Sequence, residues 1–376
     1  MQRRIAVVIA DLGGGGAQRV LHGLVLDWLK SDIEVTVITI SGNDKDVYLF
    51  PLKVKRIALD LALPSTSLLS AISKNIKRVM GLRRAIIASQ APVVLSFIGA
   101  TNILVVFASL LLGKRVVVSE RNDPASQPID IVWKLLRWVT YPLANKVVTN
   151  NRKSMSYLIK FVGSQNLIYI PNNGSVQFAD EVFIKKKPKK IVLAVGRLHP
   201  QKAFDVAVDA FSQSSLPEKD WRLVILGEGN QRTLLEEQAR RLKLANHILL
   251  PGFKPDIAPW YKDAACLLVT SKYEGTPNVV LEAAYCGVPV IVSGQAGDAP
   301  LIIDKLGFGI TVETGSAEDF ASALDRFVQS ERNQFAAYTH VKKILSEEFN
   351  DDAIFAKWNE ILFIPNTLAL KAHRRG

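Results

Sequence analysis

Two glutamates, Glu274 and Glu282, stand eight residues apart in the segment SKYEGTPNVVLEAAYCGVPVI of the second half of the chain. The turn after Glu274 contains Pro277, which favours the start of a helix, and the backbone N–H groups of this turn can bind a phosphate. Glu282 then lies about one turn into that helix, where its carboxylate can accept two hydrogen bonds from a ribose. The alternative for Glu282 is a solvated surface position. It stands between two apolar residues, however, and a carboxylate in that setting needs a partner.

A second group of residues is suited to a diphosphate. The segment AVGRLHPQKAFD follows an expected strand and contains Gly196, Arg197 and Lys202. Glycine lets a backbone approach phosphate oxygens, arginine can hold them through two parallel hydrogen bonds, and Lys202 adds a cation near a helix N-terminus that already favours anions. The alternative is a solvated loop with incidental basic residues. A further turn at 227–229 (Gly-Glu-Gly) also follows a strand, and such turns are common between strands and helices.

Short apolar runs alternate with helical segments along both halves of the chain. The first run, IAVVIA, is followed by a glycine cluster at 13–16 and by the amphipathic AQRVLHGLVLDWLK, which is typical of strand, phosphate-type loop and helix. No Lys-Ser or Lys-Thr follows these glycines, so they do not form an ATP-binding Walker loop. The alternation predicts an α/β fold of two tandem Rossmann-like doubly wound domains, with a ligand cleft at the carboxyl ends of the parallel strands.

The alternation is interrupted once. Residues 171–190, PNNGSVQFADEVFIKKKPKK, combine turn formers with a basic run and lack an apolar period. We therefore predict an N-terminal domain at 1–174, a linker at 175–189 and a C-terminal domain at 190–349. The last helix, about 350–376, is expected to pack back on the first domain.

The composition excludes several classes of protein. With 376 residues, 48% hydrophobic and 22% charged, the chain can bury two cores. Its two cysteines, Cys266 and Cys286, lie in apolar stretches and provide neither a disulfide framework nor a zinc site. The N-terminal apolar run is too short for a cleavable signal, and no apolar window reaches the length of a membrane span. We expect a cytoplasmic protein.

The net charge of +12 is concentrated in one region. Residues 61–160 contain fourteen lysines and arginines and three acidic residues. An anionic partner is therefore expected in the N-terminal half, and both nucleic acid and an anionic membrane surface are candidates.

The run GRLxPxK, the GxG turn and EGTPNVVLEAAYCGVPVI together resemble the donor half of family 4 glycosyltransferases, a retaining group with the GT-B fold. The glycine cluster followed by AQR resembles the GGAER type of loop in the same family. The resemblance extends over essentially the whole chain. It implies an N-terminal acceptor-binding domain, a C-terminal nucleotide-sugar-binding domain and transfer that keeps the α configuration of the donor sugar. It also implies that no metal and no cofactor other than the donor substrate are needed.

The resemblance assigns roles to matching residues. Arg197 and Lys202 would bind the donor diphosphate, Glu282 the ribose, and Glu274 would lie at the sugar and phosphate. The remaining donor-side candidates are Gly15, Gly16, Gly227, Gly252, Phe253, Gly275, Thr276, Asn278 and Val279. The sequence Asp44-Lys45-Asp46 has the form of a metal-binding motif, but it stands in a polar loop of a chain that resembles a metal-free fold.

Ser119-Glu120-Arg121-Asn122 resembles a segment in which many family members carry Ser-Glu-His. Glu120, Arg121 and Glu274 are the catalytic candidates. Arg121 replaces a titratable histidine with a group that does not give up its proton, so a general-base role is not expected for it. Asn172-Asn173-Gly174 resembles the PNGV segment at the hinge between domains.

The acceptor side is predicted from the segment 67–90, SLLSAISKNIKRVMGLRRAIIASQ. Its apolar residues form one broad stripe beside basic residues, which suits an anionic headgroup or a diphosphate at a membrane surface. A second basic aromatic stretch, WKLLRWVTYPLANK, supports this hypothesis. The alternative is an ordinary helix with its charged face in water. The acceptor-binding candidates are Arg19, Lys74, Lys77, Arg78 and Arg84.

These predictions describe an enzyme of polysaccharide biosynthesis at the inner face of the cell membrane. We expect it to transfer a hexose or N-acetylhexosamine from a UDP-sugar to a polyprenyl-diphosphate-linked glycan, with retention. A soluble acceptor, or a UDP-sugar epimerase with the same architecture, are alternatives within this fold. A nucleic-acid-binding protein is the alternative from another class. No stacking aromatics or recognition motif accompany the basic residues, so no nucleic acid partner is expected.

Overall fold

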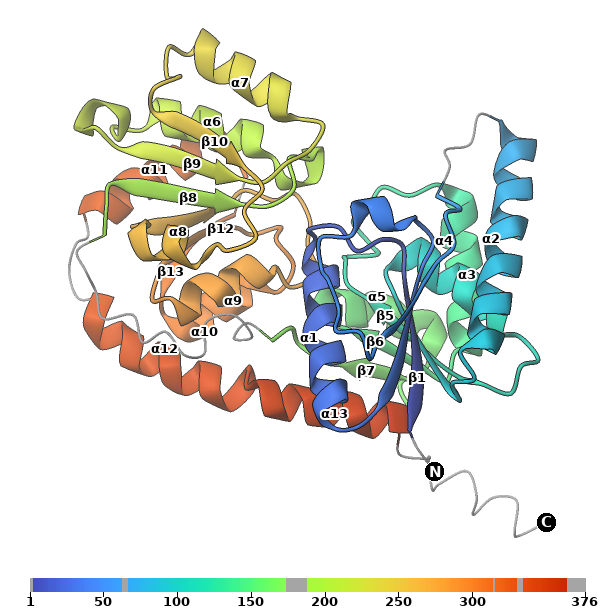
Figure 1. Ribbon diagram of the computed structural model, residues 1–376. Helices are drawn as coiled ribbons and strands as arrows, with labels where there is room; N and C mark the ends of the chain where they lie inside the picture. The colour runs from blue at the N-terminus through green and yellow to red at the C-terminus, as the bar shows by residue number, and fades with distance from the viewer. Residues whose placement is uncertain (1–2, 63–66, 174–187, 314, 330–333, 364–376) are drawn as a thin grey trace.

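The computed structural model describes residues 3–62, 67–173, 188–313, 315–329 and 334–363. Within these residues the chain forms two parallel sheets, each covered by helices on both faces (Figure 1). The predicted α/β architecture of two doubly wound domains is confirmed. The predicted linker at 175–189 lies almost entirely outside the described residues.

The first domain contains a seven-stranded sheet of order β3-β2-β1-β4-β5-β6-β7. All of its strand pairs are parallel, and the strands at its centre are buried on both faces, which is why they consist almost entirely of apolar residues. The strands are β1 (Arg4–Ile9), β2 (Glu34–Thr39), β3 (Lys55–Ala58), β4 (Val93–Phe97), β5 (Arg115–Glu120), β6 (Lys146–Thr149) and β7 (Leu167–Tyr169).

Two sets of helices cover this sheet. On one face, α1 (Gly16–Lys30) and α13 (Asp351–Phe363) share a core with the sheet. The other face has a separate core. It is covered by α2 (Leu68–Ala88), α3 (Gly99–Ser109), α4 (Ile131–Thr140) and α5 (Arg152–Val162). Short 3-10 helices, η1 (Asn43–Lys45) and η2 (Tyr141–Leu143), follow β2 and α4.

The second domain contains a six-stranded parallel sheet of order β10-β9-β8-β11-β12-β13. Its strands are β8 (Ile191–Val195), β9 (Arg222–Leu226), β10 (Ile248–Gly252), β11 (Cys266–Val269), β12 (Val290–Ser293) and β13 (Gly309–Val312). In both domains the carboxyl ends of the strands form the edge where a ligand is expected.

The helices of the second domain also divide between two faces. One face carries α6 (Phe204–Gln213), α7 (Arg232–Arg241) and α11 (Ala317–Gln329), and the other carries α8 (Ala258–Asp263), α9 (Asn278–Tyr285), α10 (Ala299–Leu306) and α12 (Gln334–Glu348). The 3-10 helices η3 (Pro200–Lys202) and η4 (Pro217–Lys219) lie before α6 and β9.

The end of the chain connects the two domains. Figure 1 shows α12 along the second domain and α13 continuing beneath the first. Trp358 of α13 is fully buried in the core of the first domain, with its ring centroid 6.3 Å from that of Phe97. Trp28 of α1 donates a hydrogen bond to Asn359 at 2.9 Å. The last helix therefore forms part of the first domain although it follows the second in sequence.

Candidate active site

The first turn of α9 contacts the first domain directly. Asn172 donates its amide N–H to the carbonyl of Thr276 at 2.7 Å, and Asn278 donates to the carbonyl of Gly16 at 3.1 Å. The hydroxyl of Thr276 donates to the carbonyl of Asn150. The turn that carries the predicted donor residues is thus held between the two sheets.

A second contact between the domains lies at the N-terminus of α5. Both carboxylate oxygens of Asp298 accept the backbone N–H of Arg152, at 2.9 and 3.0 Å. Tyr169 lies 3.4 Å from the same carboxylate. Burial raises the pKa of Asp298 above its ordinary value, and these hydrogen bonds oppose that shift. Sequence reasoning did not identify Asp298, because its partners come from the other domain.

Glu274 and Lys202 form an ion pair at the carboxyl edge of the second sheet. Glu274 is buried, and the adjacent Gln201 donates to the carbonyl of Tyr273 at 2.9 Å, which joins the loop after β8 to the loop after β11. Arg197, on the same loop as Lys202, is exposed. The structure therefore brings Lys202 and Glu274 together and leaves the Arg197 side chain in solvent beside them.

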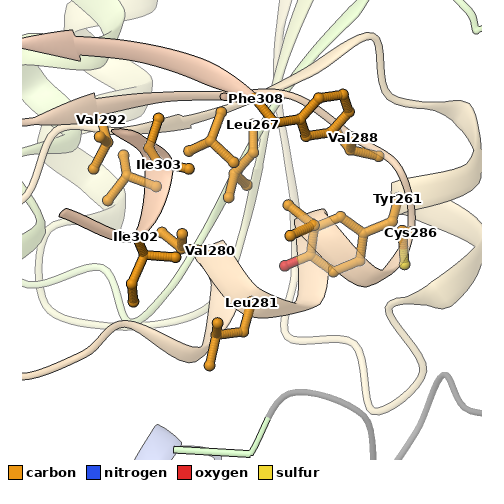
Figure 2. Packing of buried hydrophobic residues seen from close by; sticks show 14 of the residues in the cluster. Tyr261, Leu267, Val280, Leu281, Cys286, Val288, Val292, Ile302, Ile303 and Phe308 are labelled. Atoms are coloured by element: carbon orange, nitrogen blue, oxygen red, sulfur yellow. The ribbon is translucent and has the colours of Figure 1, made fainter. Parts of the chain in front are cut away.

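Glu282 is held from both domains. Its side chain is only 2% exposed and forms an ion pair with Arg19 of α1. Tyr261 of α8 donates its hydroxyl to the second carboxylate oxygen at 2.9 Å. Figure 2 shows the Tyr261 ring packed in the core of the second domain near Cys286, which fixes the hydroxyl. Sequence reasoning missed Tyr261, because nothing in its spacing indicates that it faces Glu282.

The electrostatics of this group follow from burial and proximity. Burial raises the pKa of Tyr261 well above its ordinary value, and the Glu282 carboxylate raises it further. Burial alone would lower the pKa of Arg19, but the charge of Glu282, together with smaller contributions from Tyr48 and Tyr261, more than offsets burial and leaves the pKa raised. Both hydrogen-bond donors to Glu282 therefore keep their protons near neutral pH.

The glycine loop of the first domain approaches the second domain closely. A Cβ atom added to Gly14 would lie 2.5 Å from the ring of Phe253, so only glycine fits there. In the second domain, Gly227 donates its N–H to the carbonyl of Gly252 at 3.0 Å. Gly227 has φ of +148°, and a Cβ atom there would lie 1.8 Å from the carbonyl oxygen of Gly196. Other predicted donor residues at these two edges are Gly15 at the start of α1, Gly275 before α9 and the half-buried Val279.

Glu120 lies inside the first domain. Its side chain is fully buried, accepts the hydroxyl proton of Tyr141 at 2.7 Å and lies 3.7 Å from the guanidinium of Arg137. Burial, followed by the Glu120 charge, raises the pKa of Tyr141 well above its ordinary value. The contacts described for this carboxylate thus lie within the first domain, and its catalytic role stays a prediction.

Arg121 points to a different environment from its neighbour. Its guanidinium carbon lies 5.4 Å from the ring centroids of both Phe97 and Trp358, and it donates to Asn172 at 2.5 Å. Two of its nitrogens, Nε and Nη2, are buried without a partner among the described residues. Burial lowers the pKa of Arg121 to about 9, so the group is still charged near neutral pH. Through Asn172 and Asn278, Arg121 is connected to α9.

The predicted acceptor residues are separated in the structure. Arg19 lies between the domains with Glu282, whereas Figure 1 shows α2 on the flank of the first domain away from the second. Lys77 and Arg84 of α2 are exposed, and Lys74 is half-buried. Arg78 donates to the carbonyl of Leu61 and to Asn75, both at 2.9 Å. No contact described for these four residues joins them to the donor loops.

Among the described residues, no group of three or more His, Cys, Asp or Glu side chains is arranged to hold a metal ion. No described helix is both long and apolar enough to cross a membrane.

Residues 176–342 match the family described as Glycosyl transferases group 1. The chain is 30% identical over 267 residues to the amylovoran biosynthesis glycosyltransferase AmsD of Erwinia amylovora, covering 68% of this chain and 73% of that protein. The chain belongs to this family of glycosyltransferases. It is therefore an enzyme of the hexosyltransferase class, and the family resemblance expected from its sequence is confirmed.

A second relative extends over nearly the whole of this glycosyltransferase. It is an α-1,4-N-acetyl-D-galactosaminyltransferase of Campylobacter jejuni named for the glycan GalNAc-α-(1→4)-GalNAc-α-(1→3)-diNAcBac-PP-undecaprenol. The two chains are 26% identical over 362 residues, which is 96% of this chain and 98% of the relative.

Solved structures agree on the fold of the glycosyltransferase. HepE of Anabaena, crystallised in complex with UDP, superposes with a TM-score of 0.74 at 17% identity and covers 96% of this chain and 99% of its own. Sucrose-phosphate synthase of Thermosynechococcus elongatus superposes with a TM-score of 0.79 at 18% identity, with full coverage of both chains. The predicted GT-B fold is confirmed.

Proposed function

We propose that this glycosyltransferase transfers a hexose or N-acetylhexosamine from a UDP-sugar to a polyprenyl-diphosphate-linked glycan, with retention and formation of an α linkage. The proposal is carried by the ion pair of Lys202 with Glu274 at the edge of the second sheet, and by the helix α9 that follows this turn, which contacts the first domain through Glu282 and Asn278. The reaction takes place at the inner face of the cell membrane, where the lipid carrier is embedded.

The donor half of the proposal is supported by the chemistry of these side chains. Lys202 and the exposed Arg197 supply positive charge for a diphosphate, and the first turn of α9 offers backbone N–H groups to its oxygens. Glu282 has two carboxylate oxygens that can accept ribose hydroxyls. One ribose hydroxyl would then take the place of Arg19 at the carboxylate. HepE, which has the same fold, binds UDP.

The mechanism follows from where charge develops. In retaining transfer by attack on the same face as the leaving group, the diphosphate gains negative charge and takes the proton of the attacking hydroxyl. Cations already positioned at the diphosphate stabilise that charge without rearrangement. Lys202, Arg197 and the helix N-terminus supply them, and no enzymic nucleophile is required.

The acceptor half is supported by the relatives and by charge. The relative from Campylobacter jejuni is named for a glycan on undecaprenol, a polyprenyl carrier, and AmsD is named for polysaccharide biosynthesis. On the first domain, the exposed Lys77 and Arg84 of α2 are available to the carrier's phosphates or to lipid headgroups. The glycan would extend from this flank to the cleft.

Calorimetric binding of UDP-sugars and GDP-sugars, with and without EDTA, tests the donor half. Glu282→Gln removes the charge that accepts the ribose hydroxyls, and we expect UDP-sugar binding to weaken by about tenfold to a hundredfold. Glu237→Gln, an exposed glutamate of α7, is the matched control and should bind as the wild type does. Equal affinity of Glu282→Gln and the wild type would overturn the donor site. The anomeric configuration of the product, read by NMR, tests retention.

A further inference from the structure

The helix α4 exposes most of its apolar side chains. Its fully buried side chains are Arg137 and Thr140, and Trp133 and Leu136 pack partly buried against the core. The other apolar side chains of α4, together with one in the following turn, are more than half exposed: Ile131, Val132, Leu135, Trp138, Val139 and Leu143. A helix whose apolar face points into water indicates that another apolar phase covers that face.

The inward position of Arg137 has a clear cause. Glu120 ends β5 with its side chain buried under α4, and Arg137 lies 3.7 Å from its carboxylate. Tyr141 completes the group by donating to Glu120 at 2.7 Å. Rotating α4 to bury Leu135 and Trp138 would move Arg137 away and leave Glu120 buried without a cation, which is strongly unfavourable. The buried pair therefore fixes the outward direction of the apolar face.

The neighbouring helix α2 adds a second exposed apolar stripe. The predicted stripe of this helix divides in the structure. Leu82 and Ile86 are buried in the core, while a second row at three- and four-residue spacing is at least half exposed: Leu69, Ile72, Ile76 and Met80. Both α2 and α4 pack on α3, and Figure 1 shows the three helices on one side of the sheet. The two stripes thus belong to one outer layer.

Charge on this layer is almost entirely positive. Residues 61–173 contain three acidic residues, and the structure buries two of them: Glu120 beside Arg137, and Asp123, which pairs with Lys153 at 3.0 Å. Asp130 is the one exposed carboxylate in the described part of this range. The exposed cations of α2 and α4 are Lys77, Arg84 and Lys134. Exposed apolar and cationic side chains together fit the interface of an anionic bilayer.

We propose that the outer face of α4, with the exposed stripe of α2, inserts into the headgroup region of an anionic lipid bilayer. A second copy of the chain is a poorer occupant of this face. Two such faces brought together would place like charges against each other. The inference deepens the proposed function and rests on its membrane-embedded acceptor carrier, because docking by this layer holds the first domain at the surface where that carrier lies.

Flotation of the full chain with lipid vesicles tests the proposal. Vesicles of phosphatidylcholine are compared with vesicles that also contain phosphatidylglycerol. The double variant Leu135→Gln with Leu143→Gln removes two exposed leucines of the proposed face. The matched control, Leu234→Gln with Leu301→Gln, removes two leucines of equal exposure, 56% each, from the second domain. We expect the first variant to partition about tenfold more weakly to the anionic vesicles, and the control to match the wild type.

The outcomes separate this proposal from the donor chemistry. UDP-sugar binding should be unchanged in Leu135→Gln with Leu143→Gln, because both side chains point away from the fold. Failure of the wild type to float with anionic vesicles, or equal loss in the control variant, would overturn the docking surface and leave the donor site standing. Self-association that only the α4 variant abolishes, measured by sedimentation velocity, would assign the face to a second copy instead. Lack of UDP-sugar binding beside normal flotation would overturn only the proposed function.

Discussion

In the second domain the buried carboxylates of the candidate site already have cationic partners, whereas in the first domain one buried cation has no carboxylate partner among the described residues. Glu274 is paired with Lys202, and Glu282 with Arg19. In the first domain, Arg121 lies over two neighbouring aromatic rings, with Asn172 as its described hydrogen-bond partner. The two edges thus contribute opposite electrostatic conditions to one site.

This difference in charge pairing between the two sheet edges indicates how each edge responds to a ligand. A donor that binds Glu282 exchanges one set of hydrogen bonds for another, so its binding separates Arg19 from at least part of the carboxylate. A buried cation without a counter-charge is instead ready to receive an anionic group, and it lowers the stability of the free protein until one arrives. Charge removal should therefore have opposite effects on stability at the two edges.

The largest expected effect is at Glu282. Glu282→Ala leaves Arg19 without its counter-charge and the Tyr261 hydroxyl without an acceptor. We expect the free energy of unfolding to fall by about 2–4 kcal/mol, measured by urea denaturation. Glu237→Ala, on the exposed face of α7, should change it by less than about 0.5 kcal/mol. A loss at Glu282 no larger than in this control would remove the contrast between the edges.

A smaller effect of opposite sign is expected at Arg121. Arg121→Met keeps much of the side-chain volume and removes the buried charge, so we expect the free energy of unfolding to rise by about 1–2 kcal/mol. Sugar transfer should fall in the same variant, because an anionic group loses its cation. A decrease in stability would show that the aromatic rings and Asn172 stabilise the charge more than burial costs.

The smallest expected effect is the pH dependence of the stability gained in Arg121→Met. The pKa of Arg121 is about 9 in the folded protein, well below its ordinary value. The unfolded chain therefore holds the proton more tightly, and the cost of burying the charged group decreases as the pH rises above about 9. The stability gap between Arg121→Met and the wild type should narrow by about 1 kcal/mol between pH 8 and about pH 10. A gap that is constant over this range would contradict the lowered pKa.

The elements that carry the proposed donor residues could be predicted to a large extent, because these residues lie in short local units. Glycine, arginine and lysine follow β8, and both glutamates lie in one turn and the helix after it. Strand, loop and helix are recognisable from periodicity, and parallel strands bring their carboxyl ends to one edge. The partners of the two glutamates do not all lie in such local units. Arg19 is 263 residues from Glu282 and belongs to the other domain.

The first domain was harder to predict, as α4 shows. The sequence IVWKLLRWVT predicts an amphipathic helix, and the usual expectation is that its leucines are buried. The structure buries Arg137 because Glu120 lies beneath it, and it leaves Leu135 exposed while Leu136 is partly buried. Similarly, the local sequence around Arg121 contains no sign of Trp358, which is contributed by the last helix.

By itself, the sequence determined the α/β class, the two Rossmann-like sheets, the loops that follow their strands and the family, because each depends on residue types at short spacing. The tertiary structure alone decided which charges are paired, which cation is buried without a carboxylate, and which face of α4 points outward. Those properties depend on contacts between segments far apart in the chain. In a buried site the free energy of a charge is set by its neighbours in space, and these do not follow from the spacing of residues along the chain.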